Sequence, residues 1–209
     1  MSTKTRDIAP GAAKKCKGQL DRLEKSLGSL KMLKDAPALE QALYLILREG
    51  TDFRKANKAM KLLEEEYVEW NELRVATPKE VIAVLKPTRL GDLEDKVSRM
   101  LALLSRLFYD FHKKDLEFVK IFEGPQREKI MLSLDPLPLH LTYVLLQHFD
   151  EISMDPQGIV VSQDAVARVT KKGWIRKTTS PNVARKLLGM LVADEDWYRF
   201  QYYIHRWEP

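Results

Sequence analysis

The sequence has very little of what covalent cross-links, cysteine-based metal sites or membrane insertion require. Cys16 is the one cysteine among 209 residues, which excludes an internal disulfide and any site built from several thiolates. No apolar run approaches the roughly 20 residues that span a bilayer. The first eleven residues, MSTKTRDIAPG, have no apolar core of a secretory signal. We therefore expect a cytoplasmic protein with no membrane segment.

Familiar catalytic motifs are missing as well. There is no glycine-rich phosphate loop and no Gly-x-Ser-x-Gly nucleophile turn. The histidines show no His-x-x-x-His spacing of the kind that binds zinc; they are His112, His140, His148 and His205. We predict no metal and no cofactor.

Positive charge is concentrated in two segments, although the formal net charge is only +5. Residues 1–34 carry nine bases and three acids. The interval between Asp164 and Asp194 contains no acid, and its bases are Arg168, Lys171, Lys172, Arg176, Lys177, Arg185 and Lys186. Phosphate binding requires bases that no carboxylate neutralises. Both segments are therefore candidate phosphate contacts, with a solvated basic surface as the alternative.

Apolar residues recur at helical spacing along most of the chain, which predicts an all-α fold of nine or ten helices. The longest predicted helix covers 92–114. Thr77-Pro-Lys-Glu80 is a capping box with proline at the first helical position, so a helix is expected over 78–85. Thr51 is the expected cap of a helix that starts at residue 52. A strand is considered only at 158–161.

The stretch 133–173 contains the predicted centre of the fold. A buried helix with Leu141, Val144 and Leu145 on its inner face is followed by an irregular segment and a further helix capped by Ser162. Much of the remaining chain is expected to pack around this stretch, and a functional site is expected in it.

The most specific signal is the segment 67–85, YVEWNELRVATPKEVIAVL. It resembles the endonuclease III-like branch of the helix-hairpin-helix DNA glycosylase superfamily, in which a Trp-Asn-Glu-x-Arg-Val motif forms a turn before a short capped helix. The matching residues are Trp70, Asn71, Glu72, Arg74 and Val75. The resemblance implies a two-lobed helical fold. Residues 36–149 would form a barrel lobe, and 150–209 would form a second lobe together with the basic N-terminal extension and helix, 1–34.

The chain departs from the family's pattern at the catalytic positions. The family's hairpin normally reads Leu-Pro-Gly-x-Gly-x-Lys. Its glycines fall here near Asp135 and Leu137, and its nucleophilic lysine falls at Leu139. The family's catalytic aspartate is replaced by Ser162 or Gln163, depending on a one-residue gap. The resemblance therefore implies lost or impaired chemistry.

Asp164 is the remaining candidate for the catalytic acid or base, although it also reads as a first-turn acid on the helix dipole. His140, beside the nucleophile's position, reads as a core or lining residue.

Many family members end in four cysteines that hold an iron–sulfur cluster. Here the segment 196–209, which resembles the helix preceding those cysteines, ends the sequence, so we expect no cluster.

Three functions follow as hypotheses. The first is a divergent DNA-binding protein related to base-excision repair enzymes, with contacts at Arg168, Lys171, Lys172, Arg176 and Lys177. The second is an active monofunctional DNA glycosylase that uses Asp164. The third is a protein-interaction module that has kept the fold and lost DNA.

Overall fold

Helices form almost all the regular structure of the protein, which we describe from a computed structural model. The structure describes residues 7–28, 36–134, 136–150, 163–177, 180–204 and 207. In these ranges there is no strand, only an isolated antiparallel bridge between Ile8 and Ile175. The predicted all-α class is confirmed, while the segment considered as a strand, 158–161, lies outside the described residues. No helix in these ranges is long and apolar enough to cross a membrane.

Eleven α-helices occur in the described part of the chain. Their bounds are α1 Ala12–Leu27, α2 Ala38–Arg48, α3 Phe53–Glu66, α4 Trp70–Val75, α5 Pro78–Leu85, α6 Leu93–Phe111, α7 Gly124–Leu132, α8 Leu139–Asp150, α9 Gln163–Lys171, α10 Pro181–Leu191 and α11 Trp197–Tyr203. Three short 3₁₀ helices connect them, η3 Lys86–Thr88, η4 Glu117–Ile121 and η5 Asp194–Asp196.

Helix starts follow from local capping chemistry. At α5 the Glu80 carboxylate accepts a hydrogen bond from the Thr77 amide at 2.7 Å, and the Glu80 amide donates to Thr77 Oγ1 at 3.4 Å. This confirms the predicted capping box. The predicted cap of α3 was wrong by one residue. Asp52 caps α3 and accepts from the amides of Arg54 and Lys55 at 3.0 and 3.1 Å, because its carboxylate reaches the free amides of the first turn.

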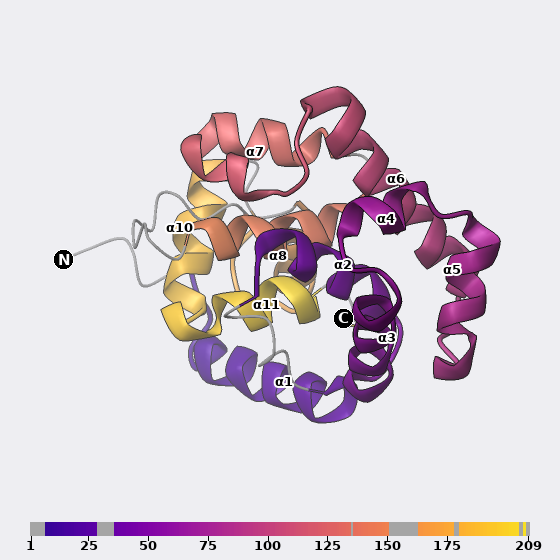
Figure 1. The fold of residues 1–209 in the computed structure, drawn as a ribbon. Coiled ribbons are helices and arrows are strands. Elements are labelled where there is room, and N and C mark those ends of the chain that lie inside the picture. The colour runs from indigo at the N-terminus through magenta and orange to yellow at the C-terminus, as the bar shows by residue number, and fades with distance from the viewer. Residues whose placement is uncertain are drawn as a thin grey trace.

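Helix α8 lies at the centre of the molecule and packs against α2, α7 and α11 (Figure 1). Leu141, Val144 and Leu145 are fully buried on it, as their spacing predicts. Burying three such side chains contributes several kcal/mol, of the order of 1.5–3 kcal/mol for each. The centre of the stretch singled out in the sequence is therefore a structural core helix.

Buried polar contacts join the end of α1 to α2 and α11. Arg48, fully buried at the end of α2, donates from Nη2 to the Gly28 carbonyl at 3.2 Å, and the Tyr203 hydroxyl of α11 donates to the same carbonyl. Gly28 has φ +85°, and a Cβ there would lie 2.9 Å from the Phe53 ring. Glycine is required at this position for both reasons. These contacts fix the C-terminal end of α1 against α2 and α11.

The N-terminal end of α1 is fixed by a second set of contacts. The Ala9 amide donates to the Trp174 carbonyl and the Arg176 amide donates to the Asp7 carbonyl, both at 2.9 Å. The Arg176 guanidinium also forms an ion pair with the Asp7 carboxylate at 3.0 Å. The segment before α1 is therefore attached to the segment after α9.

Candidate nucleic-acid interface

The positions at which the resemblance expects catalytic groups lie at the starts of α8 and α9. Leu139, in the place of the lysine nucleophile, is the first residue of α8. Gln163 and Asp164 are the first two residues of α9. Asp135 and Ser162 lie outside the described residues, as do the side chains of His140 and Asp164. An aliphatic side chain at Leu139 has no nucleophilic atom, whatever its orientation.

The turn before α8 offers few backbone donors. Pro136 and Pro138 have no amide hydrogen. The Leu137 amide donates within the chain, to the Leu134 carbonyl at 2.9 Å, and both leucine side chains are buried. A hairpin that binds a phosphate needs several free amides that approach the anion closely. This turn is packed into the apolar core instead.

The basic run after Asp164 is divided between protein contacts and solvent. Arg168 donates from Nη1 to the Trp207 carbonyl, and Arg176 is paired with Asp7. Lys171, Lys172 and Lys177 are exposed. The lysines thus remain on the surface of a segment that the two arginines hold to the rest of the fold.

A groove brings the two basic segments together. One wall is α1 and the other is the end of the basic run, and the groove has a volume of ≈ 570 Å³. We call it the basic groove; it is lined by Gly11, Lys14, Lys15, Gly18, Gln19, Arg22, Lys172, Trp174 and Trp207. No carboxylate is among these residues. The sequence predicted each basic segment separately, and the fold joins them into one surface.

The acids of α1 are used on its other side. The Arg199 guanidinium of α11 pairs with the Asp21 and Glu24 carboxylates of α1 at 2.6 and 2.8 Å. Of the ion pairs among described residues, none involves Lys14, Lys15 or Arg22. Charge is therefore separated around α1, and its uncompensated bases face the groove.

Two stacked indoles, Trp174 and Trp207, line part of the groove, and we call this part the tryptophan floor. The rings of Trp174 and Trp207 have centroids 4.7 Å apart with an interplanar angle of 26°. Both side chains are largely buried, 9% and 6% exposed, and the Lys172 ammonium lies 5.5 Å from the Trp207 centroid. The spacing of the last helix predicts Trp207 as a core residue, and it is one. Its second role at the groove floor, and that of Trp174, depend on tertiary contacts that no local pattern reports.

The inner face of α1 carries a buried thiol. Cys16 lies next to a cavity of ≈ 280 Å³ between α1 and the segment Leu191–Asp196. Burial raises the pKa of this thiol to about 12, and the nearby Asp196 carboxylate adds to the rise. A protonated, buried thiol is a poor nucleophile and a poor metal ligand. Within the described ranges, no group of three or more His, Cys, Asp or Glu residues is placed to hold a metal ion.

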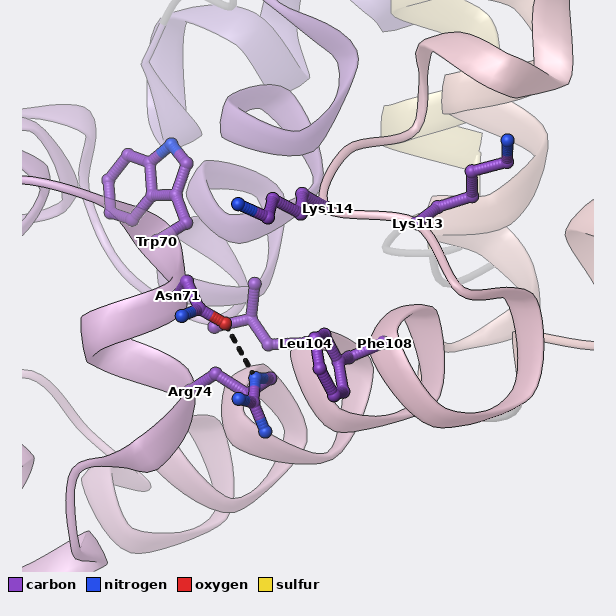
Figure 2. A pocket seen from close by; sticks show the side chains of 7 residues that line it. All are labelled: Trp70, Asn71, Arg74, Leu104, Phe108, Lys113 and Lys114. Atoms are coloured by element: carbon purple, nitrogen blue, oxygen red, sulfur yellow. Dashed lines mark hydrogen bonds between the residues drawn. The ribbon is translucent and has the colours of Figure 1, made fainter.

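The Trp-Asn-Glu-x-Arg-Val motif forms a second cationic and aromatic cluster, far along the chain from the groove. The motif, predicted as a turn, is the six-residue helix α4, which packs on α6. We call the cluster of Asn71, Arg74, Phe108 and Tyr109 the Arg74 cluster. Figure 2 shows Arg74 lying between Asn71 and Phe108, with Lys113 directed away from it.

The Arg74 guanidinium contacts three neighbouring side chains. Its guanidinium carbon lies 4.0 Å from the Phe108 centroid, Nε donates to Asn71 Oδ1 at 2.9 Å, and Nη1 donates to the Tyr109 hydroxyl at 3.4 Å. The Glu72 carboxylate accepts from the Val68 amide at 2.8 Å. The motif thus holds α4 on α6, and the cavity beside it is small, ≈ 10 Å³.

Comparison with known proteins gives a fold. No family model matches the sequence, and no curated protein matches it. The chain shares its fold with a DNA glycosylase. The structure of the 3-methyladenine DNA glycosylase MagIII from H. pylori, bound to 1,N6-ethenoadenine, superposes with a TM-score of 0.51 at 16% sequence identity. The similarity covers 91% of this chain and 99% of the glycosylase. It supports the predicted resemblance to the helix-hairpin-helix DNA glycosylase fold over most of the chain.

Proposed function

We propose that the protein binds DNA as a divergent member of the endonuclease III-like glycosylases, with glycosylase and lyase chemistry lost or impaired. The observation that carries the proposal is the basic groove, in which bases from both ends of the chain meet without a carboxylate among the lining residues. The shared fold with a DNA glycosylase supports the same class of ligand. In this proposal 36–149 form the barrel lobe, and 150–209 with 1–34 form the second lobe.

The phosphate contacts in this proposal come from exposed lysines. Lys171, Lys172 and Lys177 contact the backbone directly, while Arg168 and Arg176 hold their segment through the Trp207 carbonyl and Asp7. The bases of α1 extend the surface across the groove. The apolar turn before α8 offers few free amides, so DNA contact shifts from the hairpin to these side chains. Binding of this kind is electrostatic and weakens steeply with salt.

Loss of chemistry is proposed from the residues at the catalytic positions. Schiff-base formation requires an amine at the start of α8, and Leu139 supplies none. The aspartate's place at the start of α9 is taken by Ser162 or Gln163. Asp164 is the one acid at this helix start. Base release by wild type tests whether any chemistry survives, and its loss in Asp164→Asn tests whether Asp164 is responsible.

The first experiment measures duplex affinity by fluorescence anisotropy over a salt series. We compare the wild type with a groove variant in which Lys14, Lys15 and Lys172 are changed to glutamate. The control changes Lys25, Lys55 and Lys79, exposed lysines away from the groove, to glutamate. Both variants lower the net charge equally. We expect the groove variant to lose at least about 100-fold in affinity and the control much less, because only groove lysines release counterions at the contact.

Two results would contradict the proposal. If wild type binds neither duplex nor single-stranded DNA better than it binds a neutral polymer at low salt, DNA binding is excluded and a protein-interaction module becomes the better hypothesis. If both variants lose affinity equally, overall charge is responsible and the groove is not the site. Base release from a damaged duplex that disappears in Asp164→Asn would instead establish an active glycosylase.

A further inference from the structure

We propose that the basic groove accepts one unpaired nucleotide of single-stranded DNA, with the base on the tryptophan floor and the phosphates at the lysine rim. This inference rests on the proposed function and adds the form of DNA that the groove binds. None of the residues that line the groove is among the expected catalytic positions at the starts of α8 and α9. The proposed site therefore uses other residues than the one that the family resemblance predicts.

The groove has the size and the chemistry of a nucleotide site. Its ≈ 570 Å³ falls within the range of ligand pockets, about 300–1,000 Å³. Its lining includes Lys14, Lys15 and Lys172, which we call the lysine rim, and the tryptophan floor of Trp174 and Trp207. An apolar aromatic floor below a cationic rim matches an aromatic base attached to a phosphate. Base contact with aromatic side chains is the usual way in which proteins hold single strands.

Gly18 lines the groove at a position where no side chain fills the space. Gly18 lies in the middle of α1, where glycine is less favourable than almost any other residue. A Cβ added there would have nothing within 4 Å, and the residue lines the groove. Its φ is not in the left-handed region, so the backbone does not require glycine at this position. The missing side chain instead leaves this part of the groove lining open.

An unpaired strand fits this shape better than a duplex. In a duplex the faces of the bases are stacked on their neighbours, so only the phosphates can reach a concave surface. Those phosphates would contact the lysine rim and leave the floor uncovered. A single strand can place a base on the floor and its phosphates on the rim at once. The groove is therefore expected to prefer the single strand at equal charge.

The test blocks the groove without removing charge. We substitute Gly18→Leu, which adds a large side chain to the groove lining and replaces glycine with a better helix former. Gly189→Leu is the matched control, because Gly189 also lies within a helix, α10, with nothing within 4 Å of its Cβ position. Affinities are measured for a labelled single strand of about 12 nucleotides and for a duplex of the same length. Melting temperatures of both variants establish that the fold is intact.

We expect wild type to bind the single strand more tightly than the duplex. Gly18→Leu should lose about tenfold or more in single-strand affinity, which is the effect of removing one base–aromatic contact, and should change duplex affinity less than about twofold. Gly189→Leu should behave as wild type. Single-strand binding should also change the tryptophan emission of wild type and leave that of Gly18→Leu unchanged.

The outcomes separate this inference from the function on which it rests. If wild type binds duplex in a salt-dependent way but Gly18→Leu binds the single strand as well as wild type does, the nucleotide site is wrong and DNA binding stands. The same conclusion holds if wild type prefers the duplex. If wild type binds neither form, both proposals fail.

Discussion

The basic groove and the Arg74 cluster both place cations beside aromatic rings, yet their cations are in opposite situations. In the Arg74 cluster the guanidinium stacks on Phe108 and donates to Asn71 and Tyr109. In the basic groove, no described carboxylate pairs with Lys14 or Lys15. The first arrangement uses its cation to join α4 to α6. The second leaves Lys14 and Lys15 available to a ligand, while Lys172 lies 5.5 Å from the Trp207 centroid.

This difference shows that residue type alone does not identify a binding surface. The motif that carries the family resemblance, Trp70–Val75, has a structural role in the fold, since Asn71, Glu72 and Arg74 form hydrogen bonds within the protein. The groove has no motif, because its walls come from segments far apart in the chain. A saturated cation stabilises the fold, and an unsaturated one on a concave surface is a candidate ligand contact.

The largest expected effect on stability comes from breaking the Arg74 cluster. Arg74→Ala removes the contact with Phe108 and leaves Asn71 and Tyr109 without their donor. We expect a loss of about 2 kcal/mol in the free energy of unfolding, measured by urea denaturation, with DNA affinity within about twofold of wild type. Arg74→Lys should recover little of the loss, because an ammonium lacks the planar fork.

The opposite result would remove the contrast between the two regions. If Arg74→Ala unfolds like wild type and loses DNA affinity to the extent of the groove variants, the Arg74 cluster is a ligand contact. If it loses both, the cluster supports the groove at a distance.

The next largest effect is expected at alkaline pH, on the inner face of α1 opposite the groove. Burial raises the pKa of Cys16 from 9.0 to about 12, and burial also raises the pKa of Tyr203. The unfolded chain releases the thiol proton first, so the native state binds more protons and the free energy of unfolding falls as pH rises above about 9. One such group contributes up to about 1.4 kcal/mol per pH unit.

Urea denaturation at pH 8, 9 and 10 measures this loss. Cys16→Ala removes one of the titrating groups, so its stability should decline less steeply between pH 9 and 10 than that of wild type. Equal slopes for the two proteins would mean that the Cys16 thiol is not protected by the fold.

The smallest effect is expected from single lysines on α1. Lys15→Gln removes one groove cation and should weaken duplex binding roughly threefold to tenfold, and the slope of log affinity against log salt should fall by about 0.9. Lys25→Gln, on the same helix and outside the groove, should leave both unchanged. Equal losses in the two variants would show that α1 acts through its total charge and that the groove has no special position.

Local chemistry explains which parts of the fold the sequence predicts well. The capping box at Thr77, the spacing within α6 and the buried face of α8 all depend on residues a few positions apart. Helix α4 was missed because six residues are too few to show a helical period. Thr51 was predicted as the cap of α3, but the adjacent Asp52 competes for the same amides and is the cap in the structure.

The candidate site was predicted only in part, because it depends on contacts between distant segments. Both basic segments are visible in the sequence, but their meeting across the groove is not. The ion pair of Arg176 with Asp7 and the contact of Arg168 with the Trp207 carbonyl likewise join residues far apart in the chain. The role of Asp164 stays a prediction.

The bridge between Ile8 and Ile175 joins a segment that is synthesised before α1 to one that is synthesised after α9. Helix α1 is likewise synthesised before its partners in the groove, Lys172, Trp174 and Trp207. Until those residues leave the ribosome, the nascent chain carries a basic helix with no opposite wall. The groove can therefore form only after residue 207 has left the exit tunnel.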